Sequence, residues 1–501
     1  MSRLVITGGR VADLSAGTAE PRDLVIEDGG VAAILAPGTA EMAGAEHHDA
    51  RDRLILPGLV NSHTHGHANL VKGVADRWTL EASLTNGPWM GGARDAETIY
   101  LSTLIGALEM VSKGCTACFD LVYEFPRPTI EGFMAVARAY ADAGMRAVLA
   151  PMVADRTLFA AIPGLADSLP DDLRAEVGRF ALGSGEATLE ALEAIAEARG
   201  SLPRGITLAM APTIPHHCSE PFLMQVAGLA ERHRLPIHMH IAESRLQAVA
   251  AEKLWGRSPV AFLAERGLLS RRFIAAHAVW LSGADLDLLA EAGASVAHIP
   301  ASNFRLGAGI AHVRPMLERG IRVGLATDGA NSSDALSMPE AMRLASLASR
   351  AFDGGRDTWL SATETLRLAT EGGAGILGLA GGGRIAVGAL ADLTFYDLRH
   401  IDFMPLNDPL NQVVTAAGPD AISEVMVGGR FVKADGRISA IDPSTLRERV
   451  AETVARLTTA LDGPRALAAR LEPHVVAFAE RERAFPLPIS RLLPVEGERT
   501  S

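Results

Sequence analysis

The 501-residue sequence predicts an α/β fold: a (β/α)₈ TIM-like barrel, a small β-sandwich domain formed by both ends of the chain, and a C-terminal helical extension. Three observations lead to this prediction. In the middle of the chain, short apolar runs alternate with amphipathic stretches, as in folds where parallel strands and helices follow one another. On both sides of that region, apolar and polar residues alternate one by one. The end of the sequence contains two helical stretches.

The predicted β-sandwich domain combines residues 1–57 with residues 384–440. Residues 3–35 alternate apolar and polar side chains, with glycines between the runs, which is typical of short antiparallel strands joined by tight turns. The same pattern returns near residues 384–438. We therefore expect one domain built from both segments, with the barrel (residues 58–383) between them in sequence.

Two further segments lie outside this regular pattern. Residues 155–205 are rich in Pro, Gly, Asp and helix-forming residues, and we interpret them as an insertion after a barrel strand that could serve as a lid. Residues 441–501 form the predicted extension, with helices over residues 444–461 and 464–483. The Arg- and Glu-rich faces of these helices predict exposure to solvent, with a dimer contact as the alternative.

Composition and charge limit the classes of partner. The chain is 48% apolar and 21% charged, which suits a sizeable core. It carries 47 basic and 59 acidic residues, a net charge of −12, which argues against nucleic-acid or anionic-membrane partners. Neither a transmembrane run nor a signal peptide is predicted, and three cysteines suit a reducing compartment. We therefore expect a cytoplasmic protein.

The first chemical motif lies where an apolar strand ends, at His63-Thr64-His65. Residues i and i+2 of a strand point to the same face, so both imidazoles would face the same space. In a (β/α)₈ barrel, the carboxyl ends of all strands surround one mouth. The spacing therefore predicts two ligands of one metal ion.

Three more predicted strands end in residues of the same chemical kind. One ends in His238-Met239-His240 and is followed by Glu243; the next ends in His277; a later one ends in Asp328. Each motif alone is a weak signal, because a single histidine at a strand end is commonly structural. Four strand ends in series, around one barrel mouth, together predict a metal site.

Five segments carrying these residues resemble the amidohydrolase superfamily, and within it the branch of cytosine deaminase, S-adenosylhomocysteine deaminase and chlorotriazine hydrolase (ATZ/TRZ). The similarity runs in order from about residue 3 to residue 440 and implies a metal-dependent hydrolase barrel. The segments are Pro57-Gly-Leu-Val-Asn-Ser-His63-Thr-His65, His238-Met-His240-Ile-Ala-Glu243, His277-Ala-Val-Trp280, His298-Ile-Pro-Ala-Ser-Asn303-Phe-Arg-Leu-Gly307 and Thr327-Asp328-Gly-Ala330.

The resemblance also implies a role for each matching residue. It places the metal on His63, His65, His240 and Asp328. It implies that Glu243 carries a proton and that His277 polarises or orients the reacting group, whereas His238 is not usually a ligand in this branch. Ser302, Asn303 and Gly307 match a loop that closes one side of the site.

The lysines decide between one metal ion and two. Related sub-branches hold two ions bridged by a carboxylated lysine on the fourth barrel strand, but this sequence has no lysine between Lys113 and Lys253. We therefore expect a single divalent ion held by three histidines and one aspartate. Zn²⁺ is the first choice, with Fe²⁺ and Mn²⁺ as alternatives.

The reaction that these roles imply is hydrolysis of a carbon–nitrogen bond that is not a peptide bond. A bound divalent ion lowers the pKa of water to about 7, which supplies hydroxide. Asp328 would accept the proton of that water, His277 would hydrogen-bond the water or the oxyanion, and Glu243 would protonate a ring nitrogen beside the attacked carbon. The prediction is a metal-dependent aminohydrolase (deaminase).

We expect it to release ammonia or an amine from an aminated nitrogen heterocycle or a guanidine-like compound. The alternative is hydrolysis of a cyclic or linear amide or urea at the same site. A metal-free, partner-binding relative is a third possibility, which the intact ligand set disfavours. The resemblance also implies a homodimer.

The substrate pocket is predicted from residues 66–90, 155–205 and 213–219. In the family, a stretch like Ala-Pro-His-Ala-Pro-Tyr-Thr follows the fourth strand, and its histidine contacts substrate. Here Thr213 occupies that position, so the resemblance does not carry an adenosine-type substrate over. The candidate substrate contacts are His67, Trp78, Trp89, Thr213, His216, His217 and Asn303.

Overall fold

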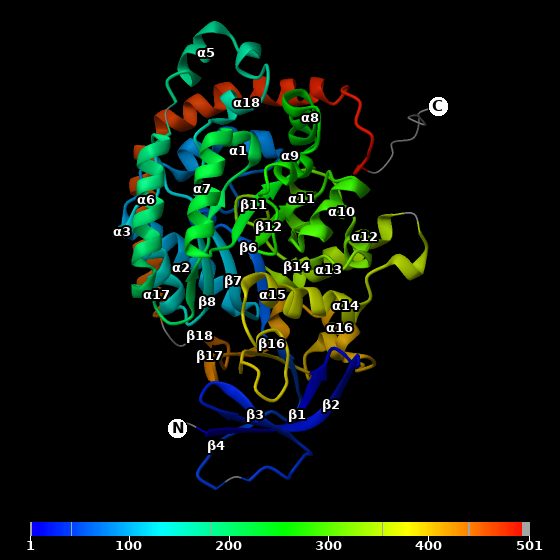
Figure 1. Cartoon of the computed structure of the whole chain (residues 1–501). Helices are drawn as coiled ribbons and strands as arrows, with labels where there is room; N and C mark the ends of the chain where they lie inside the picture. Colours follow the sequence, from blue (N-terminus) through cyan, green and yellow to red (C-terminus); the bar gives the residue numbers. More distant parts are fainter. Residues whose placement is uncertain (1–2, 42, 181, 353, 439–440, 493–501) are drawn as a thin grey trace.

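The computed structural model describes residues 3–41, 43–180, 182–352, 354–438 and 441–492. A barrel of parallel strands forms the centre of the molecule. A mixed sheet lies below it and two long helices lie beside and above it in the view of Figure 1. None of the described helices is both long and apolar enough to cross a membrane.

The lower sheet is built from both ends of the sequence, as predicted. It has nine strands in the order β18-β17-β16-β15-β5-β1-β2-β3, with β4 paired to β1. Strand β15 joins the two segments, because it lies antiparallel to β5 with Phe395 opposite Ile55. The strands are β1 (Arg3–Asp13), β2 (Thr18–Glu27), β3 (Gly30–Leu35), β4 (Glu46–Asp49), β5 (Arg53–Pro57), β15 (Leu393–Asp397), β16 (Ile422–Val427), β17 (Arg430–Ala434) and β18 (Arg437–Ile438).

The barrel consists of two parallel half-sheets, β10-β8-β7-β6 with β9 on β8, and β11-β12-β13-β14. Strands β9 and β10 pair with successive parts of β8 and share one position, so the half-sheets supply the eight positions of the predicted barrel. The strands are β6 (Leu59–Thr64), β7 (Cys115–Val122), β8 (Arg146–Val153), β9 (Ile206–Leu208), β10 (Ala211–Pro212), β11 (Ile237–Ile241), β12 (Phe273–His277), β13 (Ser295–His298) and β14 (Arg322–Leu325).

Backbone contacts close both seams between the half-sheets. One seam is a parallel bridge between Met210 and Ile237. At the other, the N–H of Asp328 donates to the carbonyl oxygen of His63 over 3.0 Å. The interior is filled by apolar side chains such as Phe119, which leaves the chemistry to the strand ends.

Helices surround the barrel. Most are capped by polar residues; for example, Asp95 accepts from the backbone N–H of Thr98 at the start of α2. They are α1 (Leu80–Gly91), α2 (Ala96–Ser112), α3 (Ile130–Asp142), α6 (Gly185–Glu197), α7 (Glu220–His233), α8 (Arg245–Trp255), α9 (Pro259–Glu265), α10 (Gly283–Ala292), α11 (Pro300–Arg305), α12 (Val313–Glu318), α13 (Met338–Ala348), α14 (Ala362–Arg367) and α15 (Gly373–Leu377). Helix α16 (Pro409–Thr415) packs against α13 and α14.

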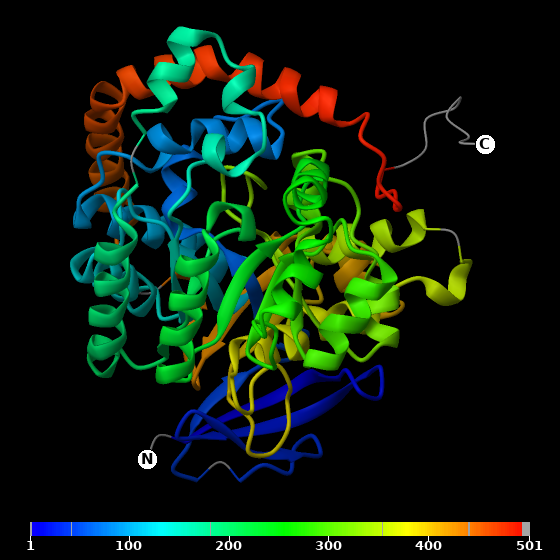
Figure 2. The ribbon, with the colours of Figure 1, turned by 45° about the horizontal axis from the view of Figure 1, so that its top comes forward.

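The inserted segment and the C-terminal extension lie together on one side of the barrel. Of the predicted insertion (residues 155–205), α4 (Leu158–Ala161) and α5 (Asp171–Val177) lie here, whereas α6 packs against α3 and α7 beside the barrel. The name insertion is kept below for residues 155–180. The extension contains α17 (Pro443–Ala460) and α18 (Asp462–Glu482). Figure 2 shows α18, in red, running beside the insertion. Leu471, Val475 and Phe478 of α18 are buried against Leu158 and Phe159 of α4. The extension is thus exposed on one face only.

Candidate metal centre and active site

The strand ends bring the predicted residues together. Strand β6 carries His63 and its end leads into His65, β11 carries His238 and His240, β12 ends at His277, and Asp328 follows β14. All six side chains are buried. The backbone at His277 (φ 65°) and Asp328 (φ 69°) adopts the left-handed conformation, which is strained for residues other than glycine and concentrates at functional sites.

The hydrogen bonds of His65 and His240 fix which of their ring nitrogens keeps its lone pair. His65 Nδ1 donates to the carbonyl oxygen of Leu121 (3.0 Å), and His240 Nδ1 donates to that of Thr213 (2.8 Å). A carbonyl oxygen only accepts, so Nε2 of each ring keeps its lone pair. His63 Nδ1 lies 3.3 Å from His238 Nε2, and its own Nε2 is buried without a hydrogen-bond partner. These free nitrogens are suited to bind a metal.

The candidate ligand atoms converge on one point. Ring nitrogens of His63, His65 and His240 lie within 4.8 Å of one another. Asp328 Oδ1 lies 3.6 Å from His63 Nε2 and 3.3 Å from His65 Nε2. Three imidazole nitrogens and one carboxylate oxygen match the donors that divalent transition metals bind. The residues present therefore fit a single divalent ion.

Burial sets the protonation of these ligands. It lowers the pKa of His63 to about 3 and that of His240 well below its ordinary value, so both rings are neutral. Burial alone would raise the pKa of Asp328, but the imidazole of His63 next to its carboxylate and the neighbouring histidines bring it well below its ordinary value. Neutral imidazoles and an ionised carboxylate are the forms that coordinate a metal.

Beside the ligands, Glu243, His277 and Asp328 form a second close group. Glu243 Oε1 lies 3.6 Å from His277 Nε2, and His277 Nδ1 donates to Asn303 Oδ1 over 3.0 Å. Burial, followed by the charges of Asp328 and Glu81, raises the pKa of Glu243 well above its ordinary value. These surroundings favour the neutral form of the Glu243 carboxyl group, which can donate a proton.

Asp120 supports the first histidine motif, and sequence reasoning missed it. Its carboxylate accepts from the N–H of Gly66 and from the hydroxyl of Tyr140, each over 2.9 Å. A Cβ at Gly66 would lie only 2.4 Å from Asp120 Oδ2, so glycine is required there. The position of Asp120 near the end of the second barrel strand was the available signal.

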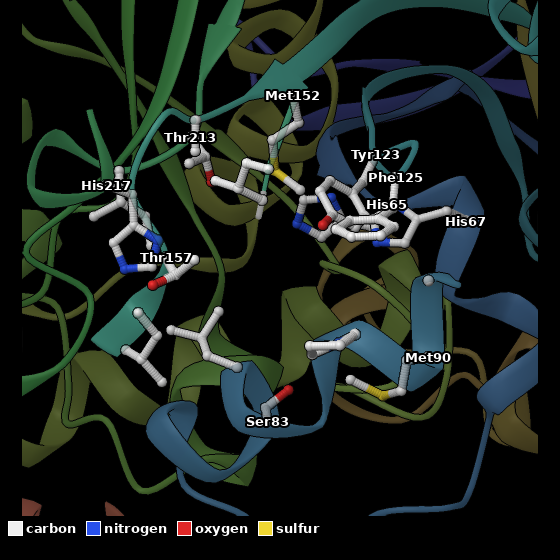
Figure 3. A pocket seen from close by; sticks show the side chains of 18 of the residues that line it. His65, His67, Ser83, Met90, Tyr123, Phe125, Met152, Thr157, Thr213 and His217 are labelled. Carbon is white, nitrogen blue, oxygen red and sulfur yellow. The ribbon is translucent and has the colours of Figure 1, made fainter. Parts of the chain in front are cut away.

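A cavity of about 500 Å³ opens beside these groups. Of the predicted site residues, His65, His67, Thr213, His217, His240, Glu243, His277 and Asp328 line it. Figure 3 shows His65, His67, Thr213 and His217 at its edge, together with Tyr123, Phe125 and Met152. These last three were not predicted, although they follow or end barrel strands, whose loops form the mouth of such a barrel.

Four predicted substrate contacts are not among the lining residues. Trp89 Nε1 donates to Asn86 Oδ1 over 2.7 Å, and the guanidinium of Arg465 covers its ring. Trp78 packs against the same apolar cluster as Trp89. His216 stacks on Trp255 with ring centroids 4.7 Å apart. Asn303 lies behind His277, to which it is hydrogen-bonded.

Comparisons with known proteins place this site in context. The model of the amidohydrolase family matches residues 54–432. A 5′-deoxyadenosine deaminase of Methanothermobacter thermautotrophicus is 32% identical over 459 residues, which cover 91% of this chain and 99% of the relative. A 5-methylthioadenosine/S-adenosylhomocysteine deaminase of Desulforudis audaxviator is 32% identical over 461 residues, with the same coverage. The zinc-bound atrazine chlorohydrolase of Arthrobacter aurescens TC1 superimposes with a TM-score of 0.77 at 27% identity, covering 91% of this chain and 99% of that one.

Proposed function

Because this chain belongs to the amidohydrolase family and is a hydrolase of carbon–nitrogen bonds, we propose that it removes an amino group from a nitrogen heterocycle or a guanidine-like small molecule. The observation that carries the proposal is the neutral Glu243 carboxyl beside the candidate metal ligands. Protonation of a ring nitrogen by such a group activates the adjacent carbon toward attack and favours loss of ammonia or an amine. The deaminases among the relatives support this reaction.

We propose that His63, His65, His240 and Asp328 hold one divalent ion. Zn²⁺ is the first choice, which the zinc in the chlorohydrolase supports, with Fe²⁺ and Mn²⁺ as alternatives. When bound, the ion supplies a strong nucleophile from water at neutral pH. The rest of the chemistry comes from the side chains of this chain.

We propose side-chain roles that follow from the pKa shifts of Asp328 and Glu243. The Asp328 carboxylate accepts the proton of the attacking water, and the Glu243 carboxyl delivers a proton to the ring nitrogen. Since Nδ1 of His277 donates to Asn303, its Nε2 accepts a hydrogen bond and orients the attacking water. We propose that His67, Thr213 and His217 contact the substrate because they line the cavity.

Matched substrates test the reaction. Metal-loaded protein is incubated with aminated heterocycles and with cyclic and linear amides and ureas, and the products are analysed by mass spectrometry. A deaminase exchanges an amino group on a ring carbon for oxygen and releases ammonia or an amine. Opening of a cyclic amide or urea adds a whole water molecule to one product, and hydrolysis of a linear amide or urea splits the substrate into two products. Turnover of the amides or ureas alone would establish the alternative function.

We propose a cytoplasmic homodimer as the working form. The three cysteines are free and buried, which suits a reducing compartment. The dimer rests on the family resemblance alone. Light scattering on the purified protein tests it, and a monomer would overturn it.

A further inference from the structure

The reactive residues line one side of the cavity, and apolar side chains line another side. This apolar side is formed mostly by Leu80, Leu84 and Met90 from α1, and by Phe159 and Phe180 from the insertion. The two phenylalanine rings lie 6.1 Å apart. Phe125 also lines the cavity and is 43% exposed. Figure 3 shows Met90 across the cavity from Thr213 and Met152.

The carboxylates of this cavity are already engaged. Among the described residues that line it, the acidic ones are Glu124, Glu243 and Asp328, and the last two belong to the reaction centre. Both oxygens of Glu124 accept from Thr129: Oε2 from its N–H over 2.8 Å and Oε1 from its hydroxyl over 2.7 Å. Apart from the reaction centre, the described lining therefore has no carboxylate whose two oxygens are both unbonded and could accept the hydroxyl protons of a sugar diol.

The other polar groups on this side do not replace a carboxylate. Arg127, Arg156 and Arg179 are exposed at the rim, and arginine only donates hydrogen bonds. Ser83 and Thr157 each offer one hydroxyl, but they come from different elements and lie apart in Figure 3. A bound diol would therefore have to divide its hydroxyl protons among separate single acceptors, with no carboxylate outside the reaction centre placed to accept both.

Building on the proposed deaminase function, we propose that the substrate is an aminated heterocycle whose distal substituent is apolar, an alkyl or aryl group, and that ribonucleosides are poor substrates. The substituent would lie between α1 and the phenylalanines of the insertion. Burial of a CH₂ or aryl surface there is favourable, because those side chains present carbon to the cavity.

Matched pairs of substrates test this inference on the metal-loaded, full-length protein. 9-Butyladenine and 5′-deoxyadenosine share one ring and one leaving amine, and differ in an alkyl chain against a diol-bearing sugar. Aminopyrimidines and aminotriazines that carry isobutyl or dihydroxypropyl groups extend the comparison to other rings. We expect kcat/KM to favour the apolar member about tenfold for each hydroxyl. Equal or faster turnover of the hydroxylated member would overturn the inference and leave the deaminase function intact.

Variants of the apolar wall provide a second test. Phe180→Asn should raise KM for the apolar member several-fold and change kcat little. The ratio of kcat/KM between the apolar and the hydroxylated member of each pair should therefore decrease. Leu347→Asn is the control, because Leu347 is 53% exposed on α13 and outside the cavity. An unchanged preference for the apolar substrate in Phe180→Asn would count against the proposal.

If none of the heterocycles loses its amine, the deaminase function fails. Calorimetric binding of the same pairs then decides the inference about the substituent. The inference stands if the apolar members bind more tightly, and it falls otherwise.

Discussion

Glu243 is a carboxyl group that its surroundings hold neutral without any direct contact to a cation. Glu243→Gln keeps the shape of the side chain but removes the transferable proton. We expect turnover to fall about 10²–10⁴-fold while the metal content stays stoichiometric, because Glu243 is not among the proposed ligands. Steady-state kinetics measure the turnover and elemental analysis measures the metal content. Glu291→Gln, at an exposed position of α10, is the matched control. Full activity in Glu243→Gln would rule out the proposed proton transfer.

Asp120 gives the stability of the protein a predictable pH dependence. Burial raises the pKa of Asp120 from 3.8 to about 6. Between these values the folded chain holds a proton that the unfolded chain has lost, so the contribution of Asp120 to stability falls as pH rises from about 4 to about 6. The change amounts to at most roughly 3 kcal/mol.

Asp120→Asn removes this titration. The difference in melting temperature, wild type minus variant, should therefore decrease between pH 4 and pH 7, as scanning calorimetry measures. Both proteins carry the same proposed metal ligands, so the pH dependence of metal binding cancels in the difference. A difference that stays constant or increases with pH would contradict the prediction.

At the scale of elements, one ion pair joins the barrel to the β-sandwich domain. Arg146, at the start of β8, binds Asp392, just before β15, through two hydrogen bonds of 2.7 and 3.1 Å. Arg146→Met leaves the buried Asp392 carboxylate without its cation, which should lower the unfolding free energy by about 3–5 kcal/mol. Urea denaturation measures the loss.

The control is Arg367→Met, which removes the exposed i,i+4 pair between Arg367 and Glu371 on the helical surface. Pairs of that kind contribute less than about 1 kcal/mol. Equal losses in the two variants would mean that the buried pair does not hold the domains together.

The sequence allowed the reaction centre to be predicted much better than the pocket wall. The His63-Thr64-His65 motif and Asp328 are local signals at strand ends. The barrel geometry brings the strand ends together in any conformation of the loops. The position of α4 depends on contacts with α18, far away in sequence. For the same reason Trp89, predicted as a substrate contact, instead packs under Arg465 of the extension. A single sequence carries no signal for such long-range pairings.

At the scale of the whole molecule, the C-terminal extension supports the wall of the cavity. Phe478 of α18 is 5% exposed and packs in one cluster with Leu158 and Phe159. Phe478→Ala should therefore loosen the insertion, increase proteolytic cleavage within residues 158–180 and raise KM more than it lowers kcat. Limited proteolysis and steady-state kinetics check this, with the exposed Glu480→Ala as control. Unaltered proteolysis would show that the insertion is stable without this contact.

The proposed ligands also lie on opposite sides of both seams of the barrel. His63 and His65 belong to one half-sheet, whereas His240 and Asp328 belong to the other. An ion bound by all four would act as a cross-link between the halves, and the two half-sheets could not move apart without breaking a coordination bond. Amide hydrogens on either side of the seams would then exchange more slowly with the ion bound. The bound ion, which would activate water, would thus also protect the barrel against unfolding.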